Sequence, residues 1–96
     1  MLALRPSCEL CDRDLPPEST DAMICSFECT FCASCVRNTL FDVCPNCGGG
    51  FARRPVRPRD RLEKYPPSAT RVVKPLDAAR HAALLARYRA VAPEKR

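Results

Sequence analysis

Apolar residues in the first half of the chain form two short patterns, each of which predicts one small element. The segment 23–31 (MICSFECTF) is dense in β-branched and aromatic residues, which predicts a short β-hairpin. Val36, Leu40 and Phe41 then recur at a spacing that gives a short helix one apolar face. Ser34 precedes them as the expected N-cap. A hairpin followed by a short helix is therefore expected near the N-terminus.

The second half of the chain predicts an extended segment followed by a longer helix. Residues 53–75 alternate arginine with proline, which disfavours helix and sheet and indicates an extended linker of polyproline character. Residues 76–91 (LDAARHAALLARYRAV) are rich in alanine and favour a helix, with Asp77 as its cap. His81, the only histidine, is expected at the surface of this helix. The apolar face consists of Leu84, Leu85, Tyr88 and Val91.

All eight cysteines lie between residues 8 and 47, and they form four closely spaced pairs. These pairs are Cys8 and Cys11, Cys25 and Cys29, Cys32 and Cys35, and Cys44 and Cys47. Two such pairs complete a closed tetrahedral shell around one zinc ion, with no open position for chemistry. The cysteines therefore predict two structural zinc ions. A disulfide framework or an iron–sulfur cluster is a weaker alternative, and a single iron suits the same four-sulfur geometry as zinc.

Two groupings of the cysteines are open. The interleaved grouping has Cys8, Cys11, Cys32 and Cys35 as site 1 and Cys25, Cys29, Cys44 and Cys47 as site 2. The sequential grouping joins the first four cysteines and the last four. The expected helix favours the interleaved grouping, because it places Cys32 and Cys35 at a helix N-terminus, where thiolates are stabilised. The predicted fold is thus a small metal-stabilised α+β, treble-clef module in residues 1–52, with a linker at 53–75 and a basic helix at 76–92.

The order and spacing of the cysteines resemble those of a RING finger, with Cys29 where most RING fingers carry histidine. Leu10 between the first two cysteines and Pro45 after the seventh also match that pattern. The resemblance implies a cross-braced pair of zinc sites and a partner surface at Leu10, Val36, Leu40 and Pro45. Gly48, however, stands where many RING ubiquitin ligases have a cationic residue.

A second resemblance covers more of the chain. The opening MLALRPSCELCDRDLPP and the later CPNCGGGF are similar to a small bacterial family of short cysteine-rich proteins without assigned function, over about residues 1–58. This resemblance implies zinc binding and no known activity. A bacterial source would also count against a ubiquitin ligase.

Charge divides the chain into an acidic and a basic half. Residues 1–51 hold three basic and seven acidic residues, a net charge of −4, whereas residues 52–96 hold thirteen and four, a net charge of +9. The basic half could bind nucleic acid or another anion through Arg53, Arg54, Arg57 and Arg59. It could equally be attracted to the acidic half of its own chain.

No nucleophile and base are placed for catalysis, so the chain is not expected to be an enzyme. The 96 residues contain no long apolar run and no signal-peptide pattern, which favours a cytoplasmic protein that does not contact a membrane. The main prediction is a structural zinc-binding module that mediates a protein interaction and whose N-terminal half unfolds without metal. The alternatives are nucleic-acid binding, a redox or zinc sensor, and a RING-type ubiquitin ligase.

Overall fold

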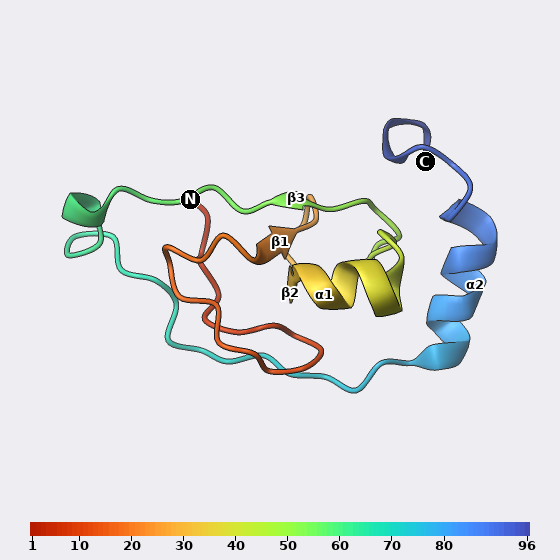
Figure 1. Cartoon of the computed structure of the whole chain (residues 1–96), viewed down its shortest axis with the longest axis horizontal. Coiled ribbons are helices and arrows are strands. Elements are labelled where there is room, and N and C mark those ends of the chain that lie inside the picture. Colours follow the sequence, from red (N-terminus) through yellow and green to blue (C-terminus); the bar gives the residue numbers. More distant parts are fainter.

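A small antiparallel sheet lies at the centre of the computed structural model, which describes residues 1–96 (Figure 1). Its strands are β1 (Ala22–Ile24), β2 (Thr30–Cys32) and β3 (Ala52–Arg53), in the order β2-β1-β3. Met23 pairs with Phe31 in the β1–β2 hairpin, so the predicted hairpin is confirmed. Strand β3, which the sequence did not predict, pairs with β1 on its other side.

A short helical segment follows β2 directly. It begins as α1 (Ala33–Cys35) and continues as a wider π-type turn, η1 (Val36–Leu40). Cys32 is the N-cap residue, and the first helical amide, that of Ala33, donates to the carbonyl of Asp21 at 2.9 Å. The prediction of Ser34 as the cap is therefore wrong by two residues. The segment ends at Phe41, whose left-handed backbone (φ 52°) cannot continue the helix.

The core between the sheet and this helix is small and rich in sulfur. Ten buried residues form it, and five of them are cysteines. Val36 and Leu40 are buried there, so they belong to the core and cannot form the predicted partner surface. Phe51 packs edge-to-face against Phe31, with ring centroids 5.5 Å apart. Phe27, by contrast, is 71% exposed at the tip of the hairpin.

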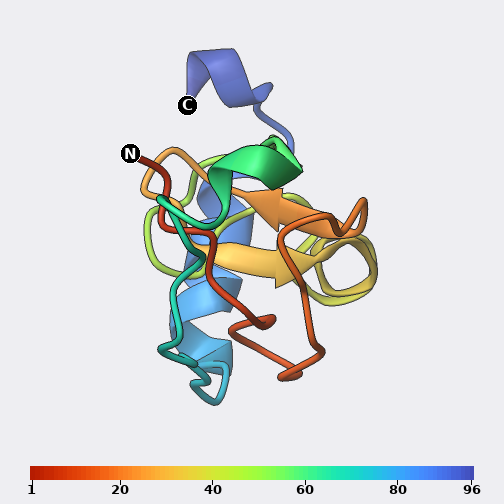
Figure 2. The ribbon, with the colours of Figure 1, turned by 90° about the vertical axis from the view of Figure 1, so that its left-hand side faces the viewer.

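Residues 54–96, which we call the tail, return along the surface of residues 1–53, which we call the head (Figures 1 and 2). A single turn, η2 (Arg59–Arg61), lies at one end of the molecule, and the chain then runs back in an extended form. The amides of Ser68 and Lys74 donate to the carbonyls of Ala3 and Glu9 in the head. The extended segment is therefore bound to the head, and β3 crosses the predicted boundary at residue 52.

The longer helix, α2 (Ala78–Tyr88), packs against the end of the head opposite η2 (Figure 1). Asp77 caps it, since its side chain accepts from the Arg80 amide at 3.0 Å, as predicted. The helix is shorter than the predicted 76–92, and a separate turn, η3 (Pro93–Lys95), follows it. The expectation that His81 lies at the surface is wrong. Its ring is 3% exposed, and Nε2 lies 3.0 Å from the carbonyl oxygen of Val43.

The docking of α2 also depends on a glycine. Gly48 has a positive φ of 78°, and a Cβ at this position would lie 2.6 Å from Cε2 of Tyr88. The ring of Tyr88 therefore sits on the backbone of the head at a place where no side chain fits. Nearby, the guanidinium of Arg89 lies 4.0 Å from the centre of the Phe41 ring, and Arg96 donates to the carbonyls of Asp42 and Gly48.

We expect the substitution His81→Ala to loosen α2 from the head. The imidazole donates to a buried carbonyl, and its loss leaves that carbonyl unpaired, at a cost of about 1–3 kcal/mol. Amide hydrogen exchange in residues 78–88 should accelerate, whereas exchange in β1 and β2 should not. Ala82→Gln, an exposed change on the same helix, is the control and should leave exchange unchanged. Equal protection in the two variants would contradict the role of His81.

Candidate metal centres

The first cysteine pair lies in a tight turn that brings both thiols to one side. The Asp12 amide donates to the carbonyl of Cys8 at 3.0 Å, and the Cys8 amide donates to the carbonyl of Arg13 at 2.8 Å. Asp12 has a positive φ of 63° where the turn closes. These backbone hydrogen bonds thus hold Cys8 and Cys11 side by side in the turn.

The last cysteine pair lies in the same kind of turn. The Gly48 amide donates to the carbonyl of Cys44 at 2.8 Å, the Cys44 amide donates to the carbonyl of Gly49 at 2.9 Å, and Gly48 has the positive φ. In addition, the Gly49 amide donates to Sγ of Cys47 at 3.4 Å. Residues 8–13 and 44–49 are therefore two copies of one hydrogen-bonded turn, an equivalence that the sequence analysis missed.

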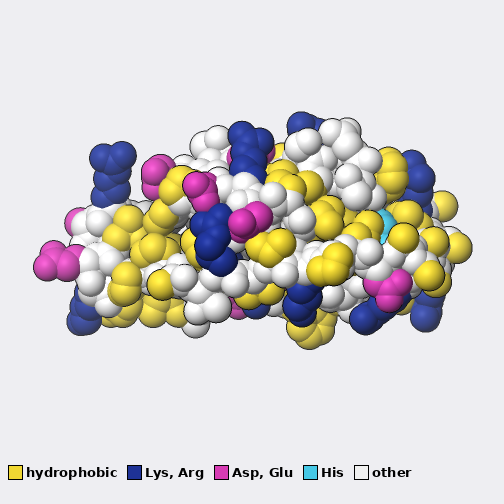
Figure 3. Space-filling view, turned by 90° about the horizontal axis from the view of Figure 1, so that it is seen from below, with side chains coloured by type: hydrophobic (Ala, Val, Ile, Leu, Met, Phe, Trp, Pro, Cys, Tyr) yellow, Lys and Arg dark blue, Asp and Glu magenta, His cyan; other side chains and the backbone are white.

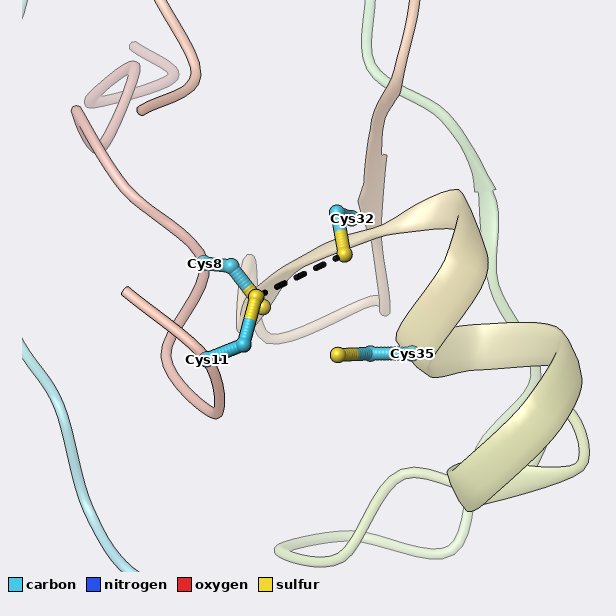
Figure 4. A group of neighbouring side chains, drawn as sticks. All are labelled: Cys8, Cys11, Cys32 and Cys35. Atoms are coloured by element: carbon cyan, nitrogen blue, oxygen red, sulfur yellow. Dashed lines mark hydrogen bonds between the residues drawn. The ribbon is translucent and has the colours of Figure 1, made fainter. Parts of the chain in front are cut away.

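Four cysteines from three separate elements converge in the first cluster (Figure 4). Cys8 and Cys11 come from the first turn, Cys32 from the end of β2 and Cys35 from α1, and their sulfurs all lie within 4.8 Å of one another. The Sγ atoms of Cys11 and Cys32 are 3.8 Å apart. A tetrahedral ion with sulfur ligands at about 2.3 Å separates those ligands by about 3.8 Å. The cluster therefore has the dimensions of a four-sulfur metal site.

The second cluster brings together three cysteines, Cys25, Cys44 and Cys47, again within 4.8 Å. Cys29, which the sequence placed in the same site, lies beside the cluster and not within it. It neighbours Cys25 across the hairpin turn, and its sulfur accepts a hydrogen bond from Nδ2 of Asn46 at 3.4 Å. Three sulfurs could hold a metal ion here.

Burial disfavours the ionised form of most of these thiols. It raises the pKa of Cys35 and of Cys44 far above that of a free thiol, and it raises the pKa of Cys29 and Cys32 as well. Burial also acts on Cys11, but hydrogen bonds from the Arg13 amide and the neighbouring thiols outweigh it and lower its pKa. A metal ion that binds four thiolates must therefore displace protons, and its affinity must rise with pH.

Glu9 is a buried acid that the sequence analysis treated only as part of the negative charge. It lies between Cys8 and Cys11 and is 6% exposed. Its carboxylate accepts from the Thr30 amide and from Nη1 of Arg5, at 2.7 Å for the latter. The Glu9 amide in turn donates to the Thr30 carbonyl, so Glu9 joins the first turn to β2. The sequence did offer a signal for this role of Glu9, because the residue lies between two candidate metal ligands.

Two residues of the predicted partner surface remain accessible. Leu10 and Pro45 are half-buried and line a cavity of about 200 Å³ between head and tail. Leu76 and Arg80 line the cavity from the tail. The tail therefore covers part of the surface that the sequence assigned to a partner.

The four arginines predicted to bind anions differ in availability. Arg54 is 1% exposed and donates to the carbonyls of Arg5, Leu15 and Pro16. Arg57 donates to the carbonyls of Tyr65 and Leu2. An anion would have to displace these bonds, so only Arg53 and Arg59 are exposed and free of such partners.

Elsewhere in the tail, Arg71 forms ion pairs that join the basic half of the chain to the acidic half. Its guanidinium bridges Asp12, at 2.9 Å, and Asp14, at 2.8 Å. Asp12 lies in the turn that carries Cys11, and Asp14 directly follows this turn, so the tail is attached beside the first cluster. No helix in the structure has the length and apolar character needed to cross a membrane.

Comparison with known proteins confirms the predicted resemblance to a small bacterial family without assigned function. An uncharacterised protein of Rhizobium meliloti (strain 1021) is 65% identical over 79 residues, which cover 82% of this chain and 94% of the relative. No solved structure matches the chain. The model of a family described as proteins of unknown function (DUF1272) matches residues 1–57, the part that holds all eight cysteines. The chain therefore belongs to the DUF1272 family.

Proposed function

We propose that this protein is a structural zinc-binding module with two zinc ions. Site 1 consists of Cys8, Cys11, Cys32 and Cys35, and site 2 of Cys25, Cys29, Cys44 and Cys47. The observation that carries the proposal is the convergence of four sulfurs from three elements at the spacing of a tetrahedral shell. The repeated turn at residues 8–13 and 44–49 supports a second site of the same kind.

The proposed ions hold the fold together and do not take part in a reaction. Four thiolates leave no position open for a substrate or a water molecule. His81, the only histidine, is occupied by the Val43 carbonyl and is not paired with a nucleophile. We therefore propose that the protein is not an enzyme.

Native mass spectrometry of the protein purified without added metal tests this proposal. We expect the mass of the polypeptide plus two divalent ions, and we expect elemental analysis to identify them as zinc. Cys29→Ser should weaken the binding of one ion only, because Cys29 is the proposed fourth ligand of site 2. Ser26→Ala, at the exposed tip of the same hairpin, should retain both ions.

Two results would contradict the proposal. A folded sample with the mass of the bare polypeptide would exclude structural metal altogether. Two ions bound with full affinity in Cys29→Ser would exclude Cys29 as a ligand while leaving the rest of the proposal standing.

The proposed biological role is a protein interaction, with Leu10 and Pro45 as the contact surface. Support comes from their apolar side chains, which border the cavity between head and tail. Ubiquitin-ligase activity has less support, because the ring of Tyr88 fills the space in which a cationic side chain at position 48 would lie.

Nucleic-acid binding is the weaker of the two binding roles. Arg54 and Arg57 donate to carbonyls of the protein, and Arg71 is paired with two acids. On the face shown in Figure 3, Lys and Arg side chains are dispersed among acidic and hydrophobic ones and form no single basic patch. Phosphate binding depends on such clustering.

A further inference from the structure

The eight cysteines differ in how easily a reagent from solution reaches them. Cys11 is exposed and Cys35 is half-buried, whereas Cys8 and Cys32 in the same cluster are buried. In the second cluster Cys25 and Cys44 are buried, and Cys47 is half-buried. The ring of Tyr88 and the side chain of Leu84 cover the adjacent Gly48. Cys11 is therefore the most exposed of the eight cysteines, and α2 covers the backbone beside the second cluster.

The exposed sulfur also has a neighbour with which it can form a disulfide. Sγ of Cys11 lies 3.8 Å from Sγ of Cys32, and the two residues belong to different elements, the first turn and β2 (Figure 4). An exposed thiolate beside a second thiol is the arrangement in which oxidation proceeds to a disulfide.

On the basis of the proposed metal sites, we propose that Cys11 is the site at which a hydroperoxide oxidises the protein, with Cys32 as the resolving residue. The Cys11 thiolate attacks one peroxide oxygen and the O–O bond breaks. Sulfur keeps that oxygen as a sulfenic acid, and the other oxygen leaves as water or an alcohol after taking a proton. The Cys32 thiolate then attacks the Cys11 sulfur, so that the S–S bond forms as the S–O bond breaks, and the oxygen leaves as hydroxide, which takes a proton from solvent to become water. Two thiolates together supply the two electrons that reduce the peroxide.

This disulfide removes two of the four ligands of site 1, and the metal ion leaves. The same turn holds the tail, through the ion pairs of Arg71 with Asp12 and Asp14 and through the bond from the Lys74 amide to the Glu9 carbonyl. Loss of the ion removes one anchor of this turn, so the contacts of residues 71–74 with the head weaken. Oxidation at one sulfur is thereby coupled to loosening of this part of the tail.

Titration of the metal-loaded full chain with hydrogen peroxide tests this inference by native mass spectrometry. We expect the protein to lose one ion first, and two of its cysteines to become oxidised in the same step. The second ion should stay bound until the peroxide concentration is severalfold higher. Alkylation and peptide mapping of the one-ion species should find a disulfide between Cys11 and Cys32. Treatment with a dithiol and Zn²⁺ should restore the original mass.

A pair of tail variants tests the coupling without altering any ligand. Arg71→Ala removes both ion pairs from the first turn, so loss of the first ion should accelerate about two- to fivefold. Arg59→Ala, an exposed arginine without such pairs, should leave the rate unchanged. Simultaneous loss of both ions, or a first disulfide within the second cluster, would overturn the inference but not the proposed function. A metal-free mass before any peroxide is added would overturn both.

Discussion

We expect a chelator, applied under reducing conditions, to unfold the head and Zn²⁺ to refold it. Five of the ten buried residues in the main core are cysteines, so little apolar surface is left to hold the sheet against the helix. A structural zinc site in a small domain contributes about 10–16 kcal/mol, as much as the whole stability of a typical domain. Loss of amide dispersion in NMR spectra, and its return with Zn²⁺, is the measurement.

The chelator itself must be excluded as the cause. A chelator saturated with zinc beforehand is the matched control, and it should leave the spectrum unchanged. Elemental analysis should then show whether the chelated sample is free of metal. If the amide signals of such a metal-free sample stay dispersed, the remaining apolar contacts are sufficient to keep the head folded.

Arg54→Ala should have the second-largest effect, a loss of about 3–5 kcal/mol in the free energy of unfolding of the metal-loaded protein. The guanidinium is buried and donates to three carbonyls from the N-terminal segment and the Leu15–Pro16 loop. Burial lowers the pKa of Arg54, and no ion pair with an acid offsets this desolvation. Truncation to alanine leaves a cavity and removes the side-chain donor from the carbonyls of Arg5 and Leu15, whereas the Pro16 carbonyl still accepts from the Ser19 amide.

Denaturant unfolding measures this loss, and the preceding residue provides the control. Arg53 is exposed on β3, so Arg53→Ala should change stability by less than about 0.5 kcal/mol. Arg54→Lys should recover only part of the stability, because one ammonium group cannot span the three carbonyls. Equal stability of the Arg53 and Arg54 alanine variants would contradict the structural role of Arg54.

Local patterns in the sequence predicted the β1–β2 hairpin and the short helix of the head and the longer helix of the tail, but not β3. The hairpin follows from the β-branched and aromatic residues at 23–31, and the cap of α2 follows from Asp77 before an alanine-rich run. Phe27 is apolar yet exposed, because it lies at the tip of the hairpin between two candidate ligands, away from the core. Composition predicts which residues prefer burial, but the path of the chain decides which of them reach the core.

The errors in the tail have a common cause. Arg54 sits in a run of arginines and prolines that is typical of a solvated segment, and only its place after β3 directs it into the head. His81 precedes Leu84, Leu85 and Tyr88 by three, four and seven residues, so helical spacing already placed it on the apolar face. Histidine is polar, and for that reason a surface position was expected despite this spacing. Long-range docking, which no local pattern encodes, determined both positions.

Because α2 and the tail residues around Leu76 belong to the same chain as the head, they act as a built-in competitor for the surface they cover. A tethered segment of this length presents itself at an effective concentration on the order of millimolar. A protein that binds the proposed contact surface at Leu10 and Pro45 must first displace the tail. The affinity of that protein for the intact chain is therefore its affinity for the uncovered surface, reduced by the cost of removing the tail. Conditions that weaken the tether, such as high salt acting on the Arg71 ion pairs, would then strengthen capture of such a protein.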